Sequence, residues 1–197
     1  KNIRTKGEFY ICPMYNLMIR DGAKVGIQQA EKMHVLGTPA ELEFFVEHVT
    51  ARFGEKPVAL CCDHSGFRMK ELAKKLLTKN DVPYIDFGTY VGKDCDYNEY
   101  VAAAVGSMKN KVSDFGMGFC RTGQGVNILA NHLPGVRSAL VIDEYTAEYS
   151  IRHNCVNFFA VPEKYVSEDM LDRMIKIWKD TTFDGGRHMT RMKKTMG

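Results

Sequence analysis

A cysteine stands at the mouth of a glycine-rich turn in the segment GMGFCRTGQGVNILANHLPG, residues 116–135. The apolar run that ends at Cys120 predicts a strand, and the apolar segment after the turn predicts a helix. A thiol beside the N–H groups at a helix start, next to Arg121, has surroundings that lower a thiol pKa. The thiolate would then act as a nucleophile or a base, although most lone cysteines are buried structural residues.

The turn itself, RTGQG at residues 121–125, can present several backbone N–H groups to an anion. No Gly-Lys-Ser/Thr follows it, and it lacks the full G-x-G-x-x-G pattern of dinucleotide sites. An oxyanion or a small phosphate is therefore favoured as the ligand. A nucleotide-binding module is kept as the alternative.

Two histidines are interpreted as lying in loops at the carboxyl ends of strands. His64 follows Asp63 at the end of the first predicted strand, and His153 closes the fourth predicted helix beside Asn154. Imidazoles at this edge suit acid–base work. The competing interpretation is that each histidine is an ordinary surface or core residue.

A basic segment, GGRHMTRMKK, ends the chain. Arg187 and Arg191 are spaced i and i+4 on one helix face, with His188 close by, and such a pair could clamp a phosphate. The alternatives are a solvated basic tail and, after it, a nucleic-acid contact. Together with Cys120 and the turn, these groups suit proton abstraction beside the carbonyl of a phosphorylated sugar, with the loop N–H groups stabilising the enediolate.

The elements that must position these groups alternate from Pro57 onward. Five apolar strands, each followed by a helix, predict an α/β fold with a doubly wound parallel sheet that has helices on both faces. The flavodoxin-like order 2-1-3-4-5 would make strands one and three neighbours and bring their following loops into one crevice. The predicted strands are 57–62, 82–88, 113–119, 136–142 and 157–161, and the predicted helices are 67–77, 97–109, 125–133, 145–154 and 167–178.

Residues 1–56 are predicted to be an N-terminal extension to the α/β domain at 57–197. The segment at about 38–53 has the signals of a capped helix, with Thr38 as N-cap, Pro39 at the first helical position and Glu41 completing a capping box. We expect the extension to pack on the sheet domain or on a neighbouring subunit. A lid over the site is the alternative.

Composition excludes several classes of protein. With 197 residues, a net charge of +3 and a pI near 8.5, the chain lacks the basic surface expected of a nucleic-acid partner. No apolar run approaches the roughly 18 residues of a membrane span, which predicts a soluble protein. The six cysteines form no C-x-x-C pair, so neither a metal site nor a disulfide framework is indicated, and reduced thiols in the cytoplasm are expected.

The chain resembles the ribose-5-phosphate isomerase B / galactose-6-phosphate isomerase family. The matching segments occur in the family's order and cover roughly residues 57–195: CDHSGF, IDFGTY, DYNEYVAAAV, CRTGQGVNILANHLPGVRSAL, YTAEYSIRHN and GGRHMTRM. The resemblance implies an aldose–ketose isomerisation through a cis-enediol, without metal or organic cofactor. It also implies a homodimer or a dimer of dimers whose sites are shared between subunits.

The resemblance further implies roles for individual residues. Cys120 matches the catalytic base, His153 the residue that assists ring opening, and Thr122 the hydroxyl beside the reacting carbons. The matches to substrate contacts are Asp63, His64, Asn154, Lys164, Arg187, His188 and Arg191, together with the anion-stabilising turn of Arg121, Thr122, Gly123, Gln124 and Gly125.

The family usually has glycine where this chain has Arg121, which bears on the choice of sugar. Ribose 5-phosphate and ribulose 5-phosphate form the leading substrate pair. The alternatives are another four- to six-carbon sugar phosphate, such as the galactose 6-phosphate and tagatose 6-phosphate pair, and a non-catalytic phosphosugar-binding protein of the same fold.

Overall fold

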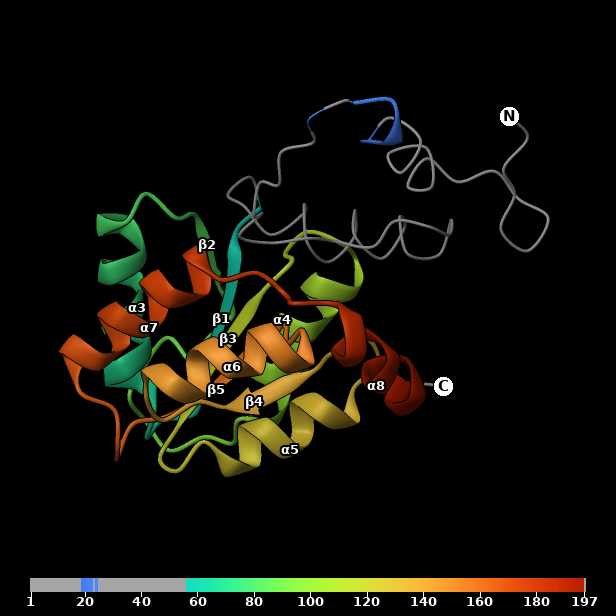
Figure 1. Ribbon diagram of the computed structural model, residues 1–197. Helices are drawn as coiled ribbons and strands as arrows, with labels where there is room; N and C mark the ends of the chain where they lie inside the picture. The colour runs from blue at the N-terminus through green and yellow to red at the C-terminus, as the bar shows by residue number, and fades with distance from the viewer. Residues whose placement is uncertain (1–18, 23, 25–55, 197) are drawn as a thin grey trace. The chain divides into compact units, whose positions relative to one another are not determined.

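The computed structural model describes residues 19–22, 24 and 56–196 (Figure 1). In the first of these segments, the Gly22 N–H donates to the Ile19 carbonyl at 3.0 Å. The predicted capped helix at 38–53 lies outside the described residues. The strands are β1 Val58–Cys62, β2 Tyr84–Asp86, β3 Gly116–Cys120, β4 Ser138–Leu140 and β5 Phe158–Pro162. The helices are α3 Phe67–Lys79, α4 Asn98–Lys109, α5 Gln124–His132, α6 Glu144–Asn154, α7 Glu168–Asp180 and α8 Gly186–Met196.

The five strands form one parallel sheet in the order β2-β1-β3-β5-β4. The predicted doubly wound α/β fold is confirmed, but the predicted order 2-1-3-4-5 is wrong in its last two positions. The reason lies in the composition of the two strands. All five residues of β5, FFAVP, are buried, so this strand needs a neighbour on each side, whereas β4 has three half-buried residues and lies at the edge.

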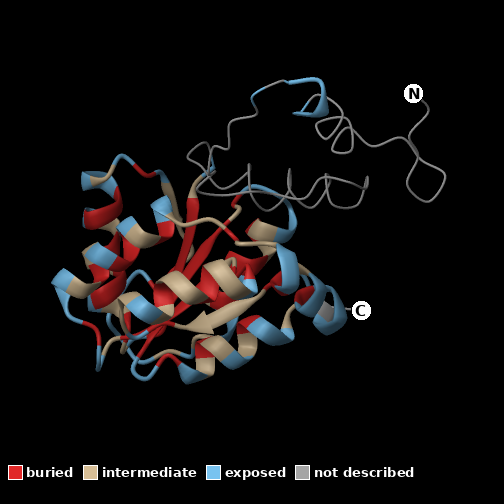
Figure 2. Cartoon of the chain, viewed as in Figure 1, coloured by how far each residue is buried: buried red, intermediate tan, exposed pale blue. Residues whose placement is uncertain are grey.

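Helices cover both faces of the sheet, because the strand side chains alternate between two apolar clusters. Along β1, Leu60 and Cys62 point into the cluster that contains the buried faces of α3, α6 and α7, while Ala59 and Cys61 point toward α4 and α5. Figure 2 shows the central strands buried between partly exposed helices. Cys120 ends β3 on the side of α4 and α5.

Helix ends fix where the chain turns back across the sheet. Asp143 caps α6 in a capping box, where its Oδ1 accepts the Thr146 N–H at 2.7 Å. Ser167 caps α7 by accepting the Met170 N–H at 3.3 Å. The last helix, α8, lies beside the end of α6 (Figure 1). A small cluster of buried side chains, Cys155, Phe183 and Met192, forms where they meet.

Candidate active site

The Cys120 sulfur lies against the start of α5. This residue is the last of β3 and is 4% exposed, and its Sγ accepts the Gly123 N–H at 3.1 Å. Gly123 is the N-cap of α5 with φ +73°, so the chain reverses from strand to helix within three residues of the thiol. A donated N–H and the positive end of a helix both stabilise a negative charge on the sulfur.

Replacing Gly123 by alanine is expected to weaken both the fold and the site. A Cβ at this position would meet Leu140 Cδ1 at 2.4 Å, in a left-handed conformation that L side chains rarely adopt. We expect the free energy of unfolding to fall by about 1–3 kcal/mol in urea titrations, and kcat to fall because the N–H leaves the sulfur. Gly135→Ala is the matched control: its φ is +85° with nothing within 4 Å, so it adds strain without a clash and should leave kcat unchanged. Equal kcat values for Gly123→Ala and Gly135→Ala would contradict a role of the Gly123 N–H at the Cys120 sulfur.

The turn after β1 packs directly on the end of β3. The Asp63 N–H donates to the Phe119 carbonyl at 3.3 Å, and the Asp63 carboxylate is buried and accepts the Gly66 N–H at 2.8 Å. A Cβ on Gly66 would lie 2.2 Å from the Phe119 carbonyl oxygen, so only glycine permits this approach. The loops after β1 and β3 therefore meet at the carboxyl edge of the sheet, beside Cys120.

His64 extends from this turn toward the loop that follows β2. Its Nδ1 lies 3.1 Å from the Cys95 carbonyl oxygen, and its Nε2 lies 3.7 Å from the Asp94 carboxylate. The imidazole is 40% exposed, which leaves it accessible to a ligand at this edge.

The loop after β5 pairs with the same glycine-rich turn. The N–H groups of Glu163 and Lys164 donate to the carbonyls of Cys120 and Arg121, at 2.9 and 3.1 Å. The side chains of Arg121 and Lys164 are exposed, as is that of Thr122. The exposed side chains near the buried sulfur thus include two cations, Arg121 and Lys164, and the hydroxyl of Thr122.

Sequence reasoning missed Tyr97 as a residue of this edge. A Cβ on Gly125 would lie 2.5 Å from the Tyr97 hydroxyl oxygen, so the phenol packs directly on the glycine-rich turn. Tyr97 precedes α4, and the sequence pattern predicts it only as the first residue of a helix. A single sequence offers one signal for this contact: a second glycine in the turn, which is typical of close approach by another group.

His153 and its neighbours lie at the opposite edge, which corrects the prediction that this histidine belongs to a carboxyl-end loop. Helix α6 starts after β4 and runs back, so its last residues precede the amino end of β5. The Asn157 carbonyl accepts the N–H of Gly116, the first residue of β3, whereas Cys120 is the last. The length of β3, roughly 13 Å at about 3.3 Å per residue, therefore separates Cys120 from the edge at which α6 ends.

The structure thus sorts the predicted residues into two groups. The carboxyl-edge group contains Asp63, His64, Cys120, Arg121, Thr122, Gly123, Gln124, Gly125 and Lys164, and the amino-edge group contains His153, Asn154, Arg187, His188 and Arg191. Within one chain, the structure does not bring the sulfur of Cys120 to the imidazole of His153.

The amino-edge group is organised around two stacked imidazoles. The rings of His153 and His188 are 4.1 Å apart between centroids and inclined by 9°, and the Tyr149 ring meets His153 edge-on at 4.9 Å. Asp184 Oδ2 lies 4.0 Å from His153 Nε2, and Arg152 Nε binds the same oxygen at 3.2 Å. These contacts fix the imidazole of His153 at the end of α6.

Helix α8 adds positive charge to this group. Burial, followed by the charges of His153, Arg187 and Arg191, lowers the pKa of His188, which favours its neutral form. The Arg187 Nε donates to His188 Nε2 at 3.4 Å. Arg187 and Arg191 are exposed, so their guanidinium groups are accessible to an anion.

The comparisons with known proteins agree with this architecture. The sequence model of the Ribose/Galactose Isomerase family matches residues 58–195. The chain belongs to this family. Ribose-5-phosphate isomerase B of Escherichia coli is 30% identical over 138 residues, which cover 70% of this chain and 93% of that protein.

Solved structures of family members superpose on the sheet domain. A ribose 5-phosphate isomerase of Thermotoga maritima has a TM-score of 0.69 and 32% identity, covering 71% of this chain and 97% of that one. Ribose-5-phosphate isomerase B of Mycoplasma genitalium, solved with bound ribulose-5-phosphate, has a TM-score of 0.68 and 26% identity, covering 73% and 95%. Within the described part of this chain, no three His, Cys, Asp or Glu side chains are grouped to hold a metal ion. None of the helices seen there has the length and apolar character needed to cross a membrane.

Proposed function

We propose that the protein interconverts an aldose phosphate and a ketose phosphate through a cis-enediolate, with ribose 5-phosphate and ribulose 5-phosphate as the pair. The observation that carries the proposal is the Cys120 sulfur, which accepts the Gly123 N–H inside an anion-binding turn of a chain from this family. The names of two relatives, ribose-5-phosphate isomerase B of E. coli and of M. genitalium, support the choice of sugar.

The chemical step is a proton transfer between neighbouring carbons. The Cys120 thiolate takes the proton from C2 of the open-chain aldose, and the electron pair moves to form the C1–C2 double bond and a negative charge on O1. The other backbone N–H groups of the turn at residues 121–125 stabilise that charge, while the Gly123 N–H donates to the sulfur. The thiol then returns the proton to C1, and the O2 hydroxyl proton moves to O1, which leaves the ketose. The Thr122 hydroxyl lies beside the reacting carbons.

Ring opening and phosphate binding require the other edge of the sheet. We propose that His153 donates the proton that opens the sugar ring, that Asn154 contacts the sugar, and that Arg187 and Arg191 hold the phosphate. Since these groups lie the length of β3 away from Cys120 in one chain, the site is completed across a homodimer. One copy supplies Cys120, Asp63 and His64, and its partner supplies His153 and α8. Lys164 adds a further positive charge near the phosphate, and the neutral imidazole of His188 contributes a hydrogen-bonding group.

A panel of four-, five- and six-carbon sugar phosphates, followed by NMR in D2O, tests the proposal. We expect ribulose 5-phosphate to form from ribose 5-phosphate, with deuterium entering at the carbons between which the proton moves. Turnover confined to a six-carbon sugar would replace the substrate by the galactose 6-phosphate pair. Binding of the panel without exchange or turnover would identify a non-catalytic phosphosugar-binding protein.

Arg121 is proposed to select the length of the sugar. Its side chain is exposed on the turn that holds Cys120, while its carbonyl is fixed by the Lys164 N–H. We expect Arg121→Ala to change the ratio of kcat/KM between five- and six-carbon substrates by about tenfold, with a change in melting temperature of less than a few degrees. The same panel measures the ratio. Equal losses for all sugars would show that Arg121 contributes only general attraction for the phosphate.

We further propose that residues 1–56 are an extension to the isomerase domain, since the family match begins at residue 58. Four cysteines among the described residues, Cys61, Cys62, Cys95 and Cys120, are free thiols. Free thiols are typical of a reducing compartment, which supports a cytoplasmic location and a role in carbohydrate metabolism.

A further inference from the structure

Lys70 on α3 is a charged side chain without any exposed surface. A buried ammonium is strongly destabilising unless it is paired and hydrogen-bonded. Lys70 Nζ donates to a carboxylate oxygen of Asp86, the last residue of β2, and to Glu71 Oε1 at 3.1 Å. This buried charge lies on α3, the helix that follows the proposed site residues Asp63 and His64 along the chain.

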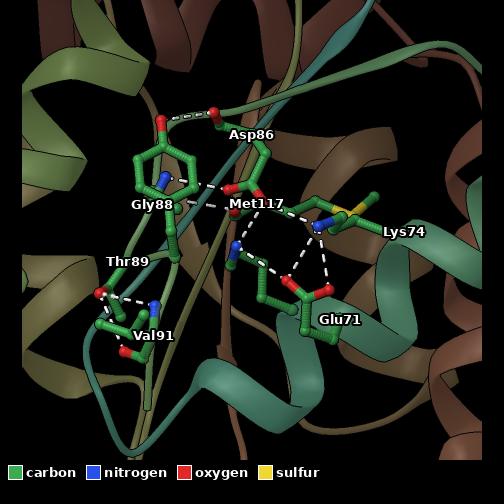
Figure 3. Close-up of polar contacts among 10 residues, drawn as sticks. Glu71, Lys74, Asp86, Gly88, Thr89, Val91 and Met117 are labelled. Carbon is green, nitrogen blue, oxygen red and sulfur yellow. Dashed lines mark hydrogen bonds and ion pairs between the residues drawn. The ribbon is translucent and has the colours of Figure 1, made fainter. Parts of the chain in front are cut away.

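The pair belongs to a four-residue network that connects α3 to the end of β2. Lys74 Nζ donates to Asp86 Oδ2 at 3.0 Å and to both oxygens of Glu71 at 2.9 Å (Figure 3). Burial raises the pKa of Asp86, but the bonds from Lys70, the Gly88 N–H and Lys74 outweigh it, so this pKa is lowered overall. Asp86 is therefore a carboxylate at neutral pH, and two cations hold it in one orientation.

That orientation determines the path of the loop after β2. Asp86 Oδ1 accepts the Gly88 N–H at 2.9 Å, as Figure 3 shows. The Gly88 carbonyl in turn accepts the Cys62 N–H at 2.7 Å, and the Thr89 N–H donates to the Cys62 carbonyl at 3.0 Å. Both backbone groups of Cys62 are thus bound by this loop, directly before Asp63.

The far end of the same loop reaches the next site residue. His64 Nδ1 lies 3.1 Å from the Cys95 carbonyl oxygen and 3.3 Å from the Cys95 amide nitrogen. Between the two ends of the loop lies Tyr90, whose hydroxyl donates to the Asp86 carbonyl at 3.0 Å. The Lys70 ammonium lies 5.7 Å from the centroid of the Tyr90 ring. The loop of residues 86–95 therefore runs from the buried ion pair to Cys62, directly before Asp63, and to His64.

We propose that Lys70 is a positioning residue: through Asp86 it fixes the loop of residues 86–95, which holds Asp63 and His64 in the geometry that binds the sugar phosphate. The inference rests on the proposed function for the roles of Asp63 and His64. Lys70 itself is fully buried and does not contact substrate. An apolar side chain could fill its volume, but it could not orient the Asp86 carboxylate toward the Gly88 N–H.

The test compares Lys70→Met with Lys74→Met. Each variant removes a lysine that binds the carboxylates of Asp86 and Glu71. Lys74 is 26% exposed, however, and its loss leaves Asp86 bound to the buried Lys70. We expect Lys70→Met to raise KM about tenfold with kcat changed less, and Lys74→Met to change KM by less than about twofold. Equal KM values for Lys70→Met and the unchanged protein would overturn the proposal.

A double-mutant cycle separates positioning from general destabilisation. If Lys70 acts through the residues after β1, Lys70→Met in a background that carries both Asp63→Ala and His64→Ala should raise KM by much less than about tenfold. An additive effect would show that Lys70 acts elsewhere, and would overturn the proposal. Should Lys70→Met fail to fold, Asp86→Asn is measured in the same cycle, with the same two outcomes.

A readout independent of turnover completes the test. The ring resonances of His64, assigned by their loss in His64→Ala, should shift in Lys70→Met and stay in place in Lys74→Met. Unchanged resonances in both variants would overturn the positioning role. If no sugar phosphate is turned over, the proposed function fails, but these resonances still decide the inference about Lys70.

Discussion

Cys120→Ala is expected to lower kcat by about a thousandfold, because the reaction loses the only base placed at the anion-binding turn in the proposed mechanism. Affinity for a phosphorylated sugar acid, measured by calorimetry, should stay within a few fold, since the phosphate-binding groups are untouched. Cys120→Ser should be nearly as inactive, because a hydroxyl is far harder to ionise than a thiol.

Cys61→Ala is the matched control for this prediction. Cys61 lies on the adjacent strand and is also buried, but burial, together with the neighbouring Cys62, raises the pKa of its thiol well above the ordinary range. We expect its loss to leave kcat nearly unchanged. If Cys120→Ala retained turnover, or if Cys61→Ala lost as much, the base would have to be another group.

Mixed dimers are expected to show the second large effect. Consider a dimer that combines one Cys120→Ala subunit with one His153→Ala subunit. If each active site is shared between the subunits, one of the two sites carries both changes and the other carries neither. Such a dimer, isolated with two different affinity tags, should have about half the activity of the unchanged dimer. Each single variant as a homodimer should be almost inactive.

The reciprocal mixed dimer gives the opposite expectation. When both changes are on one subunit and the other is unchanged, each shared site carries one defect, and activity should be lost. A site contained in one chain would reverse the two results: the first mixed dimer would be inactive and the second half active. The pair of measurements therefore decides whether the two edges of the sheet meet across an interface.

Most of the fold could be predicted from local patterns. Each strand–helix pair has its own apolar period, and parallel strands joined by helices leave few arrangements open. Strand order is different, because it depends on which strand needs two neighbours. The five buried residues of β5 and the short β4 contain that information, whereas the order of the strands along the chain does not.

The site could be predicted residue by residue but not as an assembly. Cys120, Asp63 and His64 follow strands directly, so their edge of the sheet follows from the strand assignments. His153 was misplaced because a residue that ends a helix lies at the amino edge, next to the following strand. Tyr97 was missed since its contact with the turn depends on the packing of α4 against α5, which no local pattern reveals.

The contact between Gly66 and the Phe119 carbonyl also limits how the family can diversify. No side chain fits between the turn after β1 and the end of β3. Asp63 and Cys120 therefore belong to one rigid contact that tolerates neither an insertion nor a larger residue. A longer or shorter sugar must then be accommodated elsewhere, at the exposed tip of Arg121 or on α8. New substrate preferences should accordingly accumulate as changes at these exposed side chains, while the contact between Gly66 and Phe119 stays fixed.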